Sequence, residues 1–227
     1  MMNALIQNYN NILNKINILA REQNRTVQLI AVSKTFPSTN IRELFQIGQT
    51  NFAENYAQEF AVKVQELSDL PIKWHFIGNI QSNKTKLISQ HADWVHSITT
   101  AKHAIRLNND RPAKKESLNV LIEVNISHDN NKHGLSTIEE ILSLAEIISQ
   151  QGRLTLRGLM GVASHINDAQ LINEQFHALH NLFLQLQHEY AVDTLSMGMS
   201  SDYEFAILNG ATQVRIGSLI FGERDYK

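Results

Sequence analysis

Short apolar runs alternate with amphipathic stretches along the whole chain. The first amphipathic stretch covers residues 3–22, where apolar residues recur at helical spacing. Leu29 to Ser33 then form an apolar or small run that ends at Lys34, with Pro37 as a breaker. Such a run, bounded by turn residues, is typical of a strand buried in a parallel sheet. The same pattern predicts eight strands, at residues 27–33, 51–54, 72–78, 93–98, 120–125, 154–160, 194–197 and 213–216.

Each predicted strand after the first is separated from the one before by a helical pattern or a capped turn. Strict alternation of strands and helices predicts a parallel sheet. Eight such units in 227 residues favour one closed (β/α)8 barrel, a TIM barrel, with an extra N-terminal helix and a single domain spanning residues 1–227. An open doubly wound sheet is the alternative. No G-x-G-x-x-G follows the first strand, which weakens a dinucleotide-binding interpretation.

Composition narrows the class of protein further. The net charge is −2 without a basic block, so we expect no nucleic-acid surface. The chain has no cysteine, and its ten histidines lack the carboxylate or cysteine partners of a metal site, so we expect no metal. The N-terminal residues are polar and no apolar run is long enough to span a bilayer. We therefore expect a cytoplasmic protein that does not bind membranes.

Lys34 is the first candidate for chemistry. It lies at the carboxyl end of the first predicted strand, and ligands bind at that edge of α/β barrels. A partly desolvated amine has a lowered pKa and can attack a carbonyl to form a Schiff base. The alternative is a lysine that extends from the strand end into water, which is the usual environment of this residue.

Two stretches near the C-terminus have the pattern of a phosphate site. Residues 196–202 follow the seventh strand and include Ser200 and Ser201, while Gly217 and Ser218 follow the eighth. Barrels frequently bind phosphate in the loops after these two strands. Taken alone, Ser200-Ser201-Asp202 is more often a helix cap, and only the two loops together favour phosphate. Because a closed barrel places the first strand beside the eighth, these loops and Lys34 are expected at one rim.

A lysine amine beside a phosphate pocket suits a phosphorylated aldehyde. Pyridoxal phosphate (PLP) is the first candidate, and a sugar phosphate is the alternative. Arg215, on the eighth strand, would contact the pyridine nitrogen if its side chain points into the barrel. A permanently charged donor does not leave that nitrogen protonated, so the ring would be a weaker electron sink than one paired with a carboxylate.

The chain resembles the family of pyridoxal phosphate homeostasis proteins, which have a barrel like the N-terminal domain of alanine racemase. The similarity covers essentially the whole chain, in the order of the family. Ala53 stands where the family usually has glycine, and Asn79-Ile80 replaces a more usual pair. The matching stretches are Ala31-Val32-Ser33-Lys34-Thr35, Glu54-Asn55-Tyr56 with Gln58-Glu59, Trp74-His75-Phe76-Ile77-Gly78 with Gln81, Asn83 and Lys84, Val95-His96-Ser97-Ile98, Val124-Asn125-Ile126-Ser127, Lys132 with Gly134, Leu156-Arg157-Gly158-Leu159-Met160, Ser196-Met197-Gly198-Met199-Ser200, and Val214-Arg215-Ile216-Gly217 with Ile220-Phe221-Gly222.

This resemblance implies a PLP-binding protein in which Lys34 holds the cofactor covalently as an aldimine. It implies that Asn55 lies beside the ring and that Arg215 faces the pyridine nitrogen. His75 and Asn83 match family positions without an assigned role, and Lys132 is interpreted as a solvated loop lysine. The residues that the resemblance implies for the phosphate are Ser200, Ser201, Gly217 and Ser218.

Two functions follow from the resemblance. The first is intracellular PLP homeostasis, in which a monomeric protein buffers the cofactor or delivers it to PLP-dependent apo-enzymes without robust turnover. It is favoured because no β-domain, such as the one that completes the alanine racemase site, follows the eighth strand. The second is a racemase-type PLP enzyme that is completed by an unseen partner or that uses Tyr56 or Tyr203. Schiff-base chemistry on a sugar phosphate ranks last.

Overall fold

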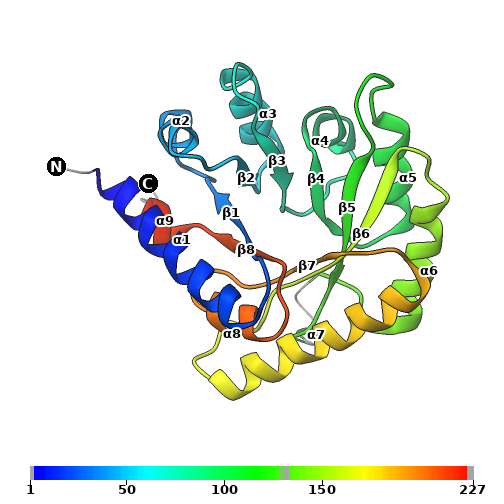
Figure 1. Cartoon of the computed structure of the whole chain (residues 1–227). Coiled ribbons are helices and arrows are strands. Elements are labelled where there is room, and N and C mark those ends of the chain that lie inside the picture. Colours follow the sequence, from blue (N-terminus) through cyan, green and yellow to red (C-terminus); the bar gives the residue numbers. More distant parts are fainter. Residues whose placement is uncertain (1–2, 128, 130–132, 224–227) are drawn as a thin grey trace.

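A closed barrel of eight parallel strands forms the centre of the molecule (Figure 1). The computed structural model describes residues 3–127, 129 and 133–223. Strand order follows chain order, and β1 pairs with β8 to close the barrel, with Ile30 opposite Arg215. The strands are β1 Gln28–Val32, β2 Asn51–Glu54, β3 Lys73–Phe76, β4 Trp94–Ile98, β5 Leu118–Val124, β6 Leu154–Gly161, β7 Thr194–Ser196 and β8 Gln213–Ile216.

The predicted fold class is therefore confirmed, and the open sheet is wrong. Each strand lies within two residues of the range that the apolar runs predicted. The predicted N-terminal helix is also present, as α1. The helices are α1 Ala4–Glu22, α2 Ser38–Gln46, α3 Ala57–Glu66, α4 Thr85–His91, α5 Ala101–Asp110, α6 Ile138–Ser149, α7 Ala169–Glu189, α8 Tyr203–Leu208 and α9 Ser218–Phe221.

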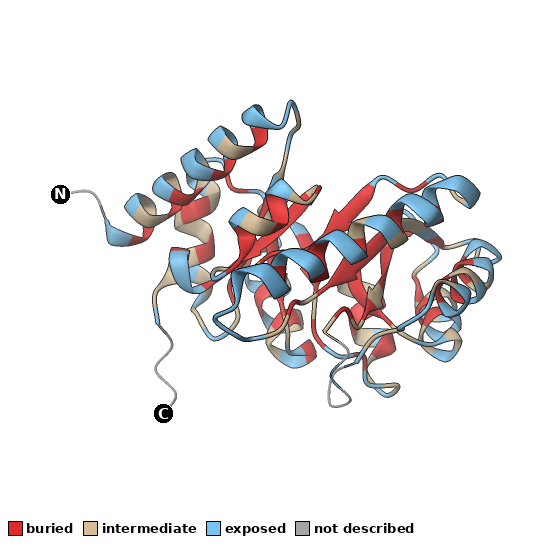
Figure 2. Ribbon diagram, turned by 90° about the horizontal axis from the view of Figure 1, so that it is seen from below, coloured by how far each residue is buried: buried red, intermediate tan, exposed pale blue. Residues whose placement is uncertain are grey.

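The helices surround the barrel and bury one face each against it. Figure 2 shows buried residues along the strands and on the inner faces of the helices, with exposed residues on the outer faces. In α1 the buried positions include Tyr9, Ile12 and Ile16, which recur at helical spacing. This helix packs against α9 and α8, so it covers the side of the barrel where β8 and β1 meet.

The interior of the barrel is divided between an apolar and a polar part. Ile30, Val32 and Ala53 form a small buried cluster with Ile77 packed against it, separate from the large core between strands and helices. Elsewhere in the interior, hydrogen bonds join side chains from strands that are not neighbours, such as His96 of β4 and Ser196 of β7. Interiors of such barrels are commonly filled by branched apolar residues, so a polar interior indicates a role beyond packing.

Candidate functional site

A cavity of about 520 Å³ opens at the carboxyl ends of β1, β7 and β8. It brings together six of the seven residues that the sequence predicted for the site, all except Asn55. Its size lies in the usual range for small-molecule and cofactor sites, roughly 300–1,000 Å³. The lining residues are Val32, Lys34, Ile77, His165, Met199, Ser200, Ser201, Arg215, Gly217, Ser218 and Glu223.

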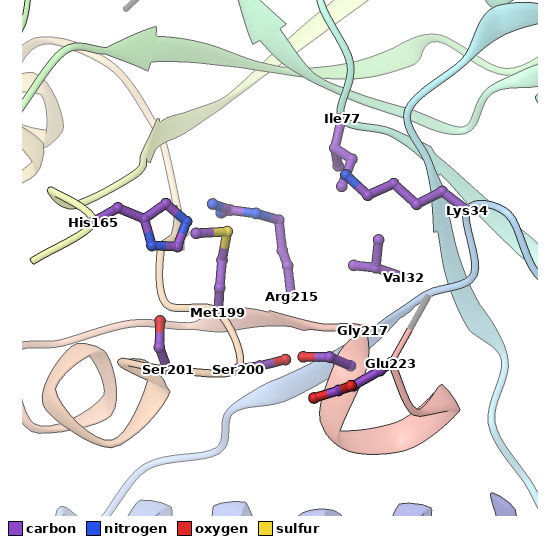
Figure 3. Close-up of a pocket in the computed structure, with 11 residues that line it drawn as sticks. Val32, Lys34, Ile77, His165, Met199, Ser200, Ser201, Arg215, Gly217 and Glu223 are labelled. Carbon is purple, nitrogen blue, oxygen red and sulfur yellow. The ribbon is translucent and has the colours of Figure 1, made fainter. Parts of the chain in front are cut away.

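Lys34 enters the cavity from the first turn after β1. The preceding inward-facing residue, Val32, belongs to the apolar cluster inside the barrel, and the strand alternation places Lys34 on the same side. Figure 3 shows its side chain extended into the cavity, whose lining also includes Ile77. Lys34 is half-buried, and its side chain can reach a ligand held in the cavity.

A buried ion cluster under α3 holds the backbone on both sides of Lys34. The Lys63 Nζ lies 2.8 Å from Glu54 Oε1 and 2.7 Å from Glu59 Oε1. It also donates to the carbonyl of Ser33, whose hydroxyl donates to Glu54 at 2.6 Å. On the other side of Lys34, the Thr35 amide donates to Glu59 at 2.6 Å. The flanking residues Ser33 and Thr35 are therefore tied to one cluster, which we call the α3 clamp: Glu54, Glu59 and Lys63.

The clamp also holds a strained backbone. Thr35 has φ +71°, a left-handed conformation that a β-branched residue rarely adopts. The hydrogen bond from the Thr35 backbone amide to Glu59 offsets part of the cost of that conformation. Burial raises the pKa of the Glu54 carboxyl, and the charge and hydrogen bonds of Lys63 oppose that rise. Both charges of the pair are desolvated, so each depends on the other.

Arg215 faces the cavity from β8 and is buried. Its Nη1 donates to the Ser196 hydroxyl at 2.8 Å, and its Nη2 donates to the Gly161 carbonyl at 3.2 Å. Burial lowers the pKa of its guanidinium to about 10, against the opposing charges of Asp202 and Glu123. The side chain therefore stays positively charged at neutral pH, and it is held as a hydrogen-bond donor.

Hydroxyl and amide groups line the side of the cavity below Arg215. Ser200 and Ser201 follow β7, and Gly217 and Ser218 open α9 after β8 (Figure 3). The β7 turn is shaped by Gly198, with φ +91°, and by the Asp202 carboxylate, which accepts from the Met199 amide at 2.6 Å. Asp202, not Ser201, occupies the N-cap position of α8. Ser201 is exposed and lines the cavity, and it does not cap α8.

The structure places Asn55 in a neighbouring pocket of about 380 Å³ with Tyr56, Gln81 and Lys84. A Cβ on Gly78 would lie 1.9 Å from the Asn55 carbonyl oxygen, so the two backbones approach closely here. Asn55 does not line the first cavity.

Three other positions that the sequence singled out lie elsewhere. Asn83 is exposed in the turn before α4, and His75 is buried inside the barrel. Lys132 lies outside the described residues. Neither Asn83 nor His75 lines the cavity in the part of the chain that the structure describes.

Sequence reasoning overlooked three features of the site. His165, from the loop after β6, points into the cavity (Figure 3), but a single histidine in a polar loop carries no signal. The clamp could have been sought from Glu59 and Lys63, which are four residues apart on one helix. His75 and His96 could have been assigned to the interior, since each occupies an alternate position of a predicted strand.

The donor set fits a phosphorylated aromatic aldehyde such as PLP. An amine lies on one side of the cavity, a charged guanidinium faces it from the adjacent strand, and hydroxyls lie below. Val32, Ile77 and Met199 supply apolar surface for a ring.

Within residues 3–127, 129 and 133–223, no group of three or more histidines and carboxylates could hold a metal ion. None of the helices in those ranges combines the length and apolar character needed to span a bilayer.

Comparison with known proteins gives one consistent result. The profile of the alanine racemase N-terminal domain matches residues 6–225. The pyridoxal phosphate homeostasis protein of Vibrio alginolyticus is 46% identical and covers 99% of this chain and 100% of its own length. That of Escherichia coli K12 is 41% identical, with 99% of each chain covered. PipY of Synechococcus elongatus, solved with PLP bound, superposes with a TM-score of 0.79 at 35% identity, over 86% of this chain and 92% of PipY.

Proposed function

The chain belongs to the family of pyridoxal phosphate homeostasis proteins, and from this premise we propose that it binds PLP in the cavity described above and buffers or delivers it inside the cell. Relatives with that name align over nearly the full length of both chains. A solved relative with 35% identity binds PLP on the same fold. The similarity to these relatives supports PLP as the ligand. The roles of individual residues are inferred from the side chains that line the cavity.

The juxtaposition of Lys34 and Arg215 is the observation that carries this proposal. β1 and β8 are hydrogen-bonded neighbours, so both side chains enter the same cavity from adjacent strands. In our proposal Lys34 would hold the aldehyde carbon through Nζ, with the aldehyde oxygen released as water. Arg215 would donate to the pyridine nitrogen. Ser200, Ser201, Gly217 and Ser218 hold the phosphate through hydroxyl and amide donors, and Asn55 acts from the adjoining pocket.

Bound PLP supplies an electron sink for chemistry at the α-carbon of amino acids, and Arg215 limits that capacity. A guanidinium that remains protonated would donate to the ring nitrogen and would leave that nitrogen without a proton of its own. The ring would then withdraw electrons less strongly than one paired with a carboxylate. This weak sink supports a carrier without robust turnover, one that hands PLP to apo-enzymes.

A racemase-type PLP enzyme is the alternative, and it would need a second proton-transfer group. Tyr203 is buried, donates to Glu204 at 3.0 Å, and has its pKa raised to about 12 by burial. Tyr56 is exposed and lines the neighbouring pocket. Neither lines the cavity among the described residues, which weighs against this alternative. His165 is the remaining candidate for such a group.

Two assays separate the carrier from the enzyme. The PLP-loaded protein should show no enzyme-like turnover and no rapid α-proton exchange across a panel of amino acids in deuterium oxide. It should transfer its PLP to an apo-enzyme supplied in excess, restoring the activity of that enzyme. Lys34-dependent exchange on any amino acid, at rates typical of enzymes, would contradict the carrier. Size-exclusion chromatography with light scattering would test the expected monomer.

A further inference from the structure

A continuous line of hydrogen bonds crosses the barrel interior behind Arg215. Arg215 Nη1 donates to Ser196 Oγ at 2.8 Å, and Ser196 Oγ lies 3.0 Å from His96 Nδ1. His96 Nε2 then lies 2.9 Å from His75 Nδ1. The line ends at Asn51, whose Oδ1 is 3.1 Å from His75 Nε2. These five residues come from five strands, β2, β3, β4, β7 and β8.

The groups at the two ends of this series of hydrogen bonds determine which atom donates in each of them. Asn51 Oδ1 accepts only, and the Asn51 amide nitrogen is engaged by Thr50 Oγ1 at 3.2 Å, so His75 Nε2 carries a hydrogen. A neutral His75 then accepts at Nδ1, which requires His96 Nε2 to donate. His96 accepts at Nδ1 from the Ser196 hydroxyl, and the Ser196 oxygen accepts from Arg215. Every donor therefore points from Arg215 toward Asn51.

Burial keeps both histidines neutral. His75, His96 and Ser196 have no exposed surface. Burial lowers the pKa of His75 to about 3, and burial together with the nearby His75 and Arg215 holds the pKa of His96 well below its ordinary value. His75 is also stacked on Trp94, with ring planes 13° apart. A positive charge on either histidine would reverse or break the order of donors.

The carboxylates near Arg215 are not the groups to which its guanidinium is hydrogen-bonded. Asp202 and Glu123 act on it through their charge, and the groups that bond it directly are the Ser196 hydroxyl and the Gly161 carbonyl. While His96 accepts at Nδ1, the hydrogen of Ser196 is directed at His96 and its oxygen accepts from Arg215, so the hydroxyl is held between the two side chains. The two neutral histidines thus help to hold the hydroxyl that binds the guanidinium.

We propose that Ser196, His96 and His75 are positioning residues for Arg215, which fix its guanidinium as a donor toward the ring nitrogen of the bound cofactor. This inference rests on the proposed function for the identity of the ligand, but the order of donors is a property of the chain alone. These hydrogen-bonded side chains occupy space in the barrel interior that apolar residues commonly fill. In our proposal their role is to direct the guanidinium of Arg215 at the cavity.

The first test needs no cofactor. In protein labelled with 15N at histidine, long-range 1H–15N spectra at pH 7 should show both His75 and His96 as neutral rings with the hydrogen on Nε2. Assignment uses His75→Gln and His96→Gln. A hydrogen on Nδ1 of either ring, or a doubly protonated ring, would overturn the proposed order whatever ligand the cavity takes.

The second test uses pyridoxal phosphate and a matched pair of serine variants. Ser196→Ala removes the link to Arg215, while Ser89→Ala removes a buried hydroxyl that donates to the Leu107 carbonyl between α4 and α5. Loss of one hydrogen bond should weaken PLP binding about fivefold in Ser196→Ala. The ring-nitrogen 15N signal of labelled PLP should also move in this variant. Ser89→Ala should match the parent in both measurements.

A pair of substitutions at His96 controls for general damage to the barrel. Gln can still accept from Ser196 and donate to His75, whereas Leu can do neither. His96→Gln should therefore retain the parent ring-nitrogen signal, and His96→Leu should resemble Ser196→Ala. Equal signals in the two variants, or a Ser196→Ala signal equal to that of Ser89→Ala, would overturn the positioning role. If the parent binds no PLP, the proposed function fails, while the tautomer result still decides the order of donors.

Discussion

Lys63 and Glu54 form a buried ion pair, 2.8 Å between Nζ and Oε1, directly behind the segment that carries Lys34. The side chain of Glu54 has no exposed surface and that of Lys63 only 6%. Through Ser33 and Thr35, the pair and Glu59 hold the backbone on both sides of Lys34. The backbone around Lys34 is therefore held by charged side chains that do not line the cavity.

Lys63→Met should destabilise the protein and displace Lys34. It leaves the Glu54 carboxylate buried without a counter-charge, so we expect the free energy of unfolding to fall by about 3 kcal/mol. Chemical denaturation measures this. Adding Glu54→Gln should recover part of the loss, because a neutral amide is less costly to bury.

The matched control for this pair is Arg42→Met, which removes an ion pair with Asp69 on the surface. Exposed pairs contribute little, so stability should hardly change. Equal denaturation midpoints for Lys63→Met and Arg42→Met would contradict the role of the clamp.

Gly78 should tolerate no side chain, because of its contact with Asn55. A Cβ there would lie 1.9 Å from a backbone oxygen that cannot move away freely. We expect Gly78→Ala to cost about 1–3 kcal/mol of stability, as for other overpacked sites. Gly152→Ala is the control, since nothing lies within 4 Å of its added Cβ. Thermal unfolding of both variants decides the point, and similar melting temperatures would count against the close approach.

The stability of the protein should fall as the pH is lowered from about 6.5 toward 3. In the unfolded chain His75 binds a proton near pH 6.5, whereas in the folded protein its pKa is lowered to about 3 by burial. Between these values the unfolded state binds more protons, so stability is present at higher pH and is lost on acidification. Each such histidine contributes a slope of up to about 1.4 kcal/mol per pH unit.

His75→Gln removes one of these titrating groups. Denaturation curves at several pH values should therefore show a flatter dependence of stability on pH in this variant than in the parent. Parallel slopes would show that His75 is protonated in the folded protein, contrary to its burial.

The phosphate end of the site can be tested by comparing PLP with pyridoxal, which lacks the phosphate. Ser200→Ala and Ser218→Ala each remove a hydroxyl from the cavity lining. Hydrogen bonds to a charged group contribute about 1.5–3 kcal/mol, so each variant should bind PLP roughly tenfold or more weakly. Binding of pyridoxal should change little. Equal losses for both ligands in fluorescence titrations would place the phosphate elsewhere.

Much of the fold follows directly from the chain. The eight strands lie where the short runs of the sequence predicted them, and Lys34 is the first charged residue after one of them. Arg215 and Lys34 line one cavity because a closed barrel makes β8 the neighbour of β1, as the count of eight alternating units favoured.

Other features depend on contacts that no local pattern encodes. The line from His96 to Ser196 joins residues 100 apart on strands that face each other across the barrel. The clamp depends on how α3 packs against the turn after β1. Asn55 follows a strand as Lys34 does, yet it lines another pocket, where its backbone lies close to Gly78. In each case the direction of a side chain is set by tertiary packing.

The central claim is that Lys34 holds PLP covalently, and one measurement tests it most directly. The visible absorption spectrum of the PLP-loaded protein is recorded before and after borohydride, followed by peptide mapping, in the parent and in Lys34→Ala. We predict a yellow chromophore that reduction fixes on the peptide containing Lys34 and that the variant lacks. Reduction onto another lysine, or a parent protein that PLP leaves colourless, would contradict the account.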